Sequence, residues 1–156
     1  MTYSTHHHSF VIEREVDASP ALVFMAWSTA EAKLAWFVGP NGWTQLVREF
    51  DFREGGSERV RGQFPDGKVS DFQCRYHDIV PDSRITYTYD MFVNNKRISV
   101  SLATIELTPK GEGTHVKLTE QIVHFDGYPT PDDREQGTQW LVEKATGWAL
   151  EQAAEV

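Results

Sequence analysis

"AWFVGPNGWTQLVREFDFREGG", residues 35–56, contains the point where helical patterning gives way to strand patterning. A helix that reaches this stretch should end near Phe37, because Gly39-Pro40 cannot continue it. From Trp43 onward the residues alternate between apolar and polar types, which is typical of a half-buried strand. Glu54-Gly55-Gly56 then supplies a tight turn. The stretch therefore predicts a helix end, a loop and the first strand of a hairpin.

The residues before this stretch predict one strand and two short helices. Residues 9–17, "SFVIEREVD", alternate as a half-buried strand does. Ser19 can cap a helix that has Pro20 at its first position. Thr29 can cap a second short helix that ends near Phe37.

The residues after this stretch predict six successive antiparallel strands. Five turn sequences separate them, and the connections are too short for parallel crossovers: Glu54-Gly55-Gly56, Pro65-Asp66-Gly67, Pro81-Asp82-Ser83, Asn94-Asn95 and Lys110-Gly111-Glu112-Gly113. After the turn-rich residues 126–133, helical spacing predicts a long closing helix from about Asp132 to Ala154.

These elements predict an α+β fold with two layers. A seven-stranded, mainly antiparallel sheet with one apolar face must cover that face, and the long C-terminal helix is the element able to do so. A curved sheet wrapped around such a helix would leave a cavity where the two shapes do not match. With 156 residues, of which 40% are hydrophobic, the chain fits one domain, expected at residues 9–156 after a flexible N-terminus of residues 1–8.

The charge and composition exclude several classes of partner. The net charge of -8 comes from 23 acidic and 15 basic residues without a dominating basic run, so neither nucleic acid nor an anionic membrane is an expected partner. No segment approaches the roughly 20 apolar residues that span a bilayer, and residues 1–10 lack the apolar segment of a secretory signal. We expect a cytoplasmic protein without stable membrane association.

The sequence contains little that would hold a cofactor or a metal ion. No phosphate-binding glycine loop or dinucleotide fingerprint is present, so no cofactor is expected. His6, His7 and His8 could chelate a metal ion, but no carboxylate or cysteine accompanies them at ligand spacing. The single cysteine, Cys74, lies in an apolar alternation that favours a buried thiol over a nucleophile. We therefore expect no metal site.

Alternation along the strands also predicts which side chains face the core or a cavity. Many of them are aromatic, and tyrosine hydroxyls among them could orient a guest molecule. The predicted inward residues are Leu46, Phe50, Phe52, Val60, Phe64, Phe72, Cys74, Tyr76, Ile85, Tyr87, Tyr89, Met91, Ile98, Val100, Leu102, Val116, Leu118 and Ile122.

Four segments carry a resemblance to a known family. They are "REVDASPALVFMAWSTAEAKLAWF" (14–37), "FDFREGG" (50–56), "DIVPDSRITYTYDM" (78–91) and "SLATIELTPKGEGTHVKLTEQ" (101–121). Together with the terminal helix they resemble the START-like (helix-grip, SRPBCC) superfamily, and within it the activator-of-heat-shock-protein-ATPase homologue family. The triplets at 119–121 and 126–128 and the "REQGT" at 134–138 are similar to an uncharacterised bacterial subgroup.

The resemblance implies a helix-grip fold with a pocket for a mostly apolar molecule between the sheet and the long helix. It places Trp36, Phe37 and Trp43 beside the cavity entrance, although the same rings could simply seal the end of the core. The predicted ligand-binding residues are Trp36, Phe37, Arg48, Phe64, Phe72, Tyr76, Tyr87, Tyr89, Glu120, Trp140 and Leu141.

Four charged residues occupy positions where alternation asks for apolar side chains: Arg14, Arg48, Glu58 and Glu120. A buried unpaired charge is costly, so these residues should pair, reach solvent or meet a polar ligand. Arg14 and Glu120 form the best candidate pair, because the first and last strands are neighbours in the resembled fold. The pair would be either a structural ion pair or a polar anchor at one end of the cavity.

The leading hypothesis for function is binding of a small hydrophobic or amphipathic molecule in this cavity. One alternative is a cyclase, isomerase or hydrolase acting on an aromatic or polyketide-like compound through Tyr87, Tyr89 and Glu120. Glu120 and His124 share a strand face but lie about 13 Å apart, too far for a catalytic dyad. Another alternative is a chaperone-associated stress-response module, although the chain lacks the additional N-terminal domain of the eukaryotic co-chaperones. Exposed surface around Trp43 or Trp148 could also support a homodimer.

Overall fold

A computed structural model of the chain describes residues 2–127 and 131–155, and within them it contains one sheet of seven strands and three helices. The elements follow the predicted order: β1 (Thr5–Val16), α1 (Pro20–Ser28), α2 (Ala30–Trp36), β2 (Thr44–Phe50), β3 (Ser57–Gln63), β4 (Val69–Val80), β5 (Arg84–Val93), β6 (Lys96–Lys110), β7 (Gly113–Phe125) and α3 (Pro131–Ala154). Part of the turn predicted at residues 126–133 lies outside the described residues.

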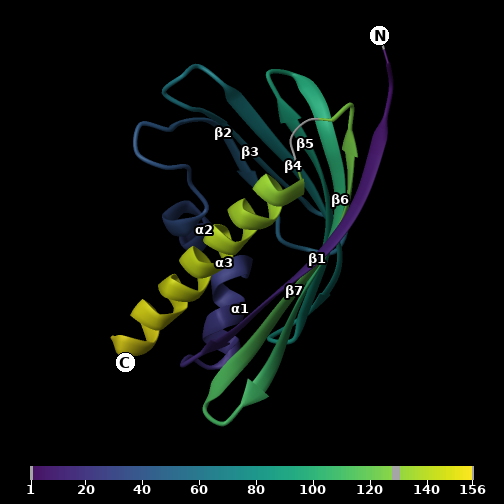
Figure 1. The fold of residues 1–156 in the computed structure, drawn as a ribbon. Coiled ribbons are helices and arrows are strands. Elements are labelled where there is room, and N and C mark those ends of the chain that lie inside the picture. Colours follow the sequence, from purple (N-terminus) through teal and green to yellow (C-terminus); the bar gives the residue numbers. More distant parts are fainter. Residues whose placement is uncertain (1, 128–130, 156) are drawn as a thin grey trace.

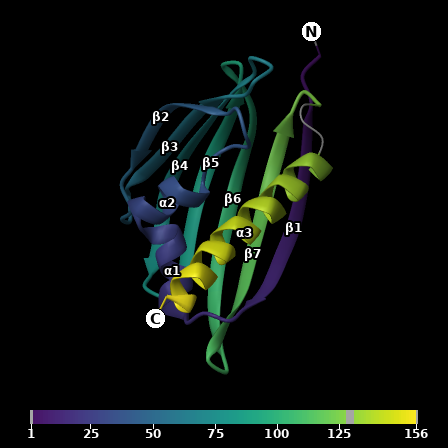
Figure 2. The same cartoon turned by 90° about the vertical axis from the view of Figure 1, so that its left-hand side faces the viewer.

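The sheet has the strand order β1-β7-β6-β5-β4-β3-β2, and every neighbouring pair is antiparallel. Each of the five predicted turns joins two consecutive strands. The helices α1 and α2 connect the two edge strands, β1 and β2. Figures 1 and 2 show α3 running obliquely across the concave face of the sheet, with α1 and α2 beside it. The predicted helix-grip fold is therefore confirmed.

The predicted caps start both short helices. The Ser19 hydroxyl accepts a hydrogen bond from the Leu22 N–H at 3.3 Å, with Pro20 at the first helical position. Thr29 caps α2 in the same way through the N–H of Ala32. No helix within the described residues has both the length and the apolar character needed to cross a membrane.

The N-terminal prediction is wrong for residues 5–8, which were expected to be flexible. β1 begins at Thr5, and His6 lies opposite His124 on β7. β7 continues to Phe125, so its backbone offers hydrogen-bonding partners beyond the point where apolar alternation in β1 begins. Backbone pairing extends the strand where the side-chain pattern gives no signal.

Two β-bulges make three of the predicted inward positions wrong. Leu46 is the extra residue where the β2–β3 register shifts, and its side chain is exposed. Ile98 is the extra residue in β6, because Met91 pairs with Ser99 while Phe92 pairs with Arg97. A bulge reverses the faces of the residues around it. Beyond Ile98 the inward positions are therefore Ser99 and Ser101, and the predicted Val100 and Leu102 point outward.

Helix α3 packs into the core from Val142 onward. Small or β-branched residues of this part, Val142, Ala145 and Ala149, are fully buried against the sheet and α1. The N-terminal half of α3 presents Gly137, Thr138 and longer side chains to open space instead. The cavity therefore lies under the N-terminal part of α3, and the packed core lies under the rest of the helix.

Candidate functional site

A cavity of about 750 Å³ lies between the first half of α3, α2 with its following loop, and the concave face of the sheet. Its wall is mainly aromatic and aliphatic. Pro40, Trp43, Lys68 and Trp140 line it and are also partly exposed, so the cavity opens between the loop after α2, the β3–β4 turn and α3. Ten of the eleven predicted binding residues lie on the wall: Trp36, Phe37, Phe64, Phe72, Tyr76, Tyr87, Tyr89, Glu120, Trp140 and Leu141.

The three rings predicted to lie beside the cavity entrance, Trp36, Phe37 and Trp43, divide between core and rim. Trp36 is buried, and its indole N–H donates to the Ala26 carbonyl at 2.6 Å, so this ring fixes α2 to α1. Phe37 meets Phe72 edge-on, with ring centroids 5.1 Å apart. Trp43 lies flat over Gly62 of β3, where a Cβ would come within 2.0 Å of its ring. A glycine on β3 therefore provides the slot that holds Trp43 at the rim.

Three tyrosines form a continuous strip along the cavity wall. Tyr76 and Tyr87 face each other across β4 and β5, with ring centroids 6.1 Å apart, and Tyr87 lies at the same distance from Tyr89. Burial raises the pKa of all three phenols, and the carboxylates of Glu58 and Glu120 add to the effect. The hydroxyls therefore stay protonated. Those of Tyr76 and Tyr89 donate to Glu58 and Glu120, which leaves the Tyr87 hydroxyl to donate a hydrogen bond to a bound molecule.

Glu120 is the centre of a buried polar group at the α3 end of the cavity. Its Oε2 accepts hydrogen bonds from the Tyr89 hydroxyl at 2.6 Å and the Ser101 hydroxyl at 2.8 Å. Arg134 lies 3.9 Å from the same oxygen and donates to the Tyr89 hydroxyl and to Ser99 Oγ. Burial raises the pKa of Glu120, while the hydrogen bond from Tyr89 and the charge of Arg134 oppose the rise.

Sequence reasoning missed Arg134, Ser99 and Ser101 as members of this group. The only signal for Arg134 was its place in the "REQGT" helix start. The two serines were assigned to the outer face, because alternation counted through Ile98 without its bulge. The Glu120 anchor, defined as Glu120, Tyr89, Ser101, Arg134 and Ser99, is thus assembled from four separate elements.

The predicted ion pair between Arg14 and Glu120 is wrong. Arg14 lies opposite Val116 in the β1–β7 ladder, whereas Glu120 lies opposite Phe10, four residues farther along and so about 13 Å away. Arg14 instead pairs with Glu143 on the surface of α3 at 3.2 Å. Adjacent strands do not bring two residues together unless their register matches.

The four inward charges do not form one cluster. Arg48 is not among the residues that line the cavity, and its guanidinium donates to the Phe37 carbonyl at 2.6 Å, bracing the loop after α2. Glu58 pairs with Lys33 of α2, a residue that sequence reasoning did not assign to the site. Glu58 and Glu120 therefore lie on different parts of the wall and have different basic side chains beside them, Lys33 and Arg134.

Cys74 of β4 and His124 of β7 are both buried. Burial raises the pKa of the Cys74 thiol to about 12, with a further contribution from Glu58, so the expected buried thiol is confirmed. Neither ring nitrogen of His124 has a hydrogen-bond partner among the described residues. Among the side chains that the structure describes, those of residues 2–127 and 134–155, no group of three or more His, Cys, Asp or Glu has an arrangement suited to a metal ion.

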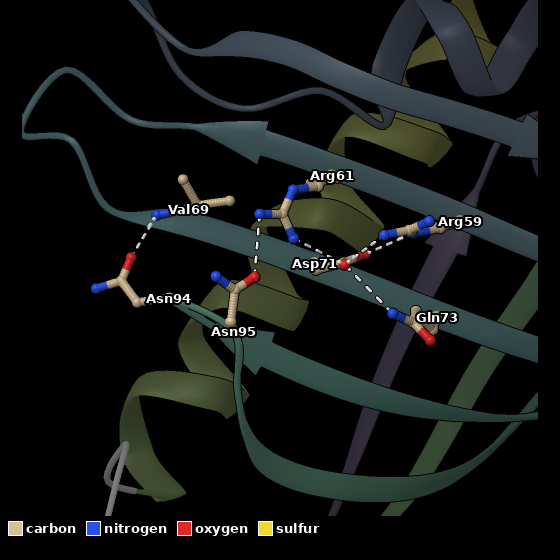
Figure 3. A network of polar contacts seen from close by, with 7 residues as sticks. All are labelled: Arg59, Arg61, Val69, Asp71, Gln73, Asn94 and Asn95. Atoms are coloured by element: carbon tan, nitrogen blue, oxygen red, sulfur yellow. Dashed lines mark hydrogen bonds and ion pairs between the residues drawn. The ribbon is translucent and has the colours of Figure 1, made fainter.

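A second polar network lies on the sheet face opposite the cavity (Figure 3). Asp71 of β4 receives two hydrogen bonds from Arg59 and one from Arg61, both on β3. Arg61 also reaches Asn95 in the β5–β6 turn. These contacts tie neighbouring strands together outside the cavity, which indicates a structural role.

Comparison with known proteins places this geometry in context. Residues 17–153 match the family described as Activator of Hsp90 ATPase homolog 1-like protein. An uncharacterised protein from Rhizobium leguminosarum is 39% identical, with 96% of this chain and 98% of that chain covered and a TM-score of 0.90. The Mll3558 protein from Rhizobium loti is 38% identical, with 93% and 99% covered and a TM-score of 0.86. A comparison of this chain with curated proteins found no match.

A more distant structure shares the fold alone. Ara h 8.0201 is 20% identical over 94% of this chain and 99% of its own, with a TM-score of 0.71. At that identity the likeness establishes the helix-grip architecture.

Proposed function

This chain belongs to the Activator of Hsp90 ATPase homolog 1-like protein family, and on that premise we propose that it binds one small hydrophobic or amphipathic molecule between its sheet and α3. The observation that carries the proposal is the cavity of about 750 Å³ with its mainly apolar wall. Ligand pockets of roughly 300–1,000 Å³ enclose small organic molecules. Burial of apolar surface would supply most of the affinity.

The polar groups on the wall would fix the orientation of the guest. The Arg134 guanidinium has five N–H donors and uses two of them on Tyr89 and Ser99, so others remain for an acceptor on the ligand. Tyr87 lies between Tyr76 and Tyr89 and can donate its hydroxyl toward the middle of the cavity. An amphipathic molecule with its polar end toward the Glu120 anchor satisfies this arrangement.

A cavity-filling substitution tests the proposal directly. N-phenyl-1-naphthylamine, an uncharged fluorophore, should bind the wild-type protein with one molecule per chain. Met91→Trp places a larger side chain on the cavity wall and should weaken binding by about tenfold or more. Leu102→Trp adds the same ring on the outer face of the neighbouring strand, where Leu102 is exposed, and should leave the Kd unchanged.

Fluorescence titration gives the Kd values, and circular dichroism confirms that both variants fold. Native mass spectrometry of gently purified protein would then identify a guest retained from the cell. Equal affinity in the wild type and in Met91→Trp would place the fluorophore outside the cavity and contradict the proposal.

A further inference from the structure

The cavity wall holds a second buried polar group, which we define as the Glu58 subsite: Glu58 of β3, Lys33 of α2 and Tyr76 of β4. Lys33 Nζ donates to Glu58 Oε1 at 3.0 Å, and the Tyr76 hydroxyl donates to the same oxygen at 2.6 Å. The side chains of Lys33 and Glu58 are only 7% and 1% exposed. A buried ion pair therefore lies in a cavity wall that is otherwise mainly apolar.

The Glu58 subsite is separate from the Glu120 anchor. Glu58 lies on β3 and Glu120 on β7, four strand steps apart in the sheet. At about 4.8 Å per step this is roughly 19 Å along the sheet. The strip of Tyr76, Tyr87 and Tyr89 fills part of the wall between them. The two groups therefore contact different parts of any molecule in the cavity.

The hydrogen bonds within the Glu58 subsite are unevenly distributed between the two carboxylate oxygens of Glu58. Both donors converge on Oε1, while Oε2 is buried and has no partner among the described residues. A buried carboxylate oxygen without a donor is unfavourable, so a ligand that supplies one gains affinity. Lys33 has three N–H donors and directs one to Glu58, while its ammonium group lies 4.6 Å from the centre of the Phe37 ring.

The charges of the subsite select the kind of ligand group. The ion pair of Lys33 and Glu58 sums to zero, so an anionic group would be repelled by Glu58 and a cationic group by Lys33. A neutral group that carries a donor beside an acceptor can satisfy both residues without adding charge to an apolar wall. A carboxamide has this arrangement, since its N–H₂ donates and its carbonyl oxygen accepts.

We propose that the Glu58 subsite binds a neutral carboxamide-like group of the ligand, which donates to Glu58 Oε2 and accepts from Lys33 Nζ. The proposal rests on the proposed function and deepens it by naming the chemistry of one end of the guest. The ligand then has an apolar body along the tyrosines and a neutral donor–acceptor group at the Glu58 end.

Three probes of matched shape test this proposal: 2-naphthamide, 2-acetylnaphthalene and 2-naphthoate. They present respectively a donor with an acceptor, an acceptor alone, and an anion on the same ring system. Their affinities are measured by displacement of N-phenyl-1-naphthylamine. The comparison uses a triple variant, Lys33→Met with Glu58→Leu and Tyr76→Phe, because replacing the whole polar group by apolar residues preserves folding better than leaving one charge unpaired.

In the wild type, 2-naphthamide should bind about tenfold more tightly than 2-acetylnaphthalene, the size expected for a buried hydrogen bond to a charged group. The anion should bind most weakly. The triple variant should lose the preference for the amide: both probes lose the hydrogen bond from Lys33, but only the amide also loses the bond to Glu58, so its affinity should fall about tenfold further than that of 2-acetylnaphthalene. Leu102→Trp should retain the wild-type preference.

Two results would overturn the inference in distinguishable ways. The same amide-to-ketone ratio in the wild type and the triple variant, with both proteins binding the fluorophore, would remove the Glu58 subsite and leave the proposed function intact. Failure of the wild type to bind the fluorophore or any of the three probes would remove both proposals.

Discussion

His124 is a buried side chain whose charge the fold opposes. It is only 1% exposed, and neither of its nitrogens is hydrogen-bonded to a described residue. Burial lowers its pKa to about 4, and the positive charge of Arg134 acts in the same direction. The unfolded chain, with a pKa near 6.5, takes up a proton at a pH where the folded protein does not. Folding stability should therefore fall as the pH drops from 7 toward 4.

Replacing His124 with leucine should remove this pH dependence. From the two pKa values, His124 costs the wild type about 2 kcal/mol of unfolding free energy between pH 7 and pH 5. The stability difference between His124→Leu and the wild type should therefore widen by that amount over the same range. Urea unfolding at both pH values measures it, and the other histidines cancel in the comparison. A constant difference would show that His124 titrates normally in the folded protein.

At the scale of elements, the outer network of Asp71 joins β3 to β4. Burial alone would raise the pKa of Asp71, but hydrogen bonds from Arg59, Gln73 and Arg61 lower it, so the carboxylate stays charged. Asp71→Asn should reduce the free energy of unfolding by about 1–3 kcal/mol, because it weakens hydrogen bonds to two guanidinium groups. Chemical denaturation at neutral pH gives the value.

A matched control on the same strand separates this network from an ordinary surface pair. Asp78 pairs with Arg84 at 2.6 Å, but both side chains are about half exposed. Asp78→Asn should therefore cost less than about 1 kcal/mol. Equal losses of unfolding free energy in the two variants would mean that the two arginines at Asp71 add no stability to the contact between β3 and β4 beyond that of an exposed ion pair.

The helix α3 contributes both to the core and to the cavity wall, and its sequence pattern does not show where one role changes to the other. Val142, Ala145 and Ala149, from its middle onward, are buried, whereas its first turns place Arg134 beside Glu120. Both halves have helical periodicity, which predicts the helix but not the change from packing to cavity wall. Trp148, considered for a homodimer contact, is half-buried and packs against the core, so the homodimer stays a prediction.

At the scale of the whole molecule, a guest between the two layers should stabilise both of them. A ligand at about 100 times its Kd adds about 2.7 kcal/mol to the free energy of unfolding. N-phenyl-1-naphthylamine at that ratio should therefore raise the unfolding midpoint, and amide hydrogen exchange should slow in both α3 and β5, which line opposite sides of the cavity. Protection confined to one layer would indicate binding at the surface.

The sequence by itself determined the architecture, because its signals are local. Turn residues at five places, caps at Ser19 and Thr29, and the two hydrophobic periods act within a few neighbouring residues, and each predicted the element that the structure contains. The same local reasoning placed Phe64, Phe72, Tyr76, Tyr87, Tyr89 and Glu120 on the cavity wall, since alternation along a strand fixes the face of each side chain. Trp36, Phe37, Trp140 and Leu141 lie in or next to helices, and their prediction depended on helical spacing and on the family resemblance.

Only the tertiary structure decided how the charges meet. Register separates Arg14 from Glu120, a bulge at Ile98 turns Ser101 inward, and the docking of α2 and α3 brings Lys33 to Glu58 and Arg134 to Glu120. These pairings depend on strand offsets and on how the helices lie across the sheet. Such relations join residues far apart in the chain, so no local pattern records them.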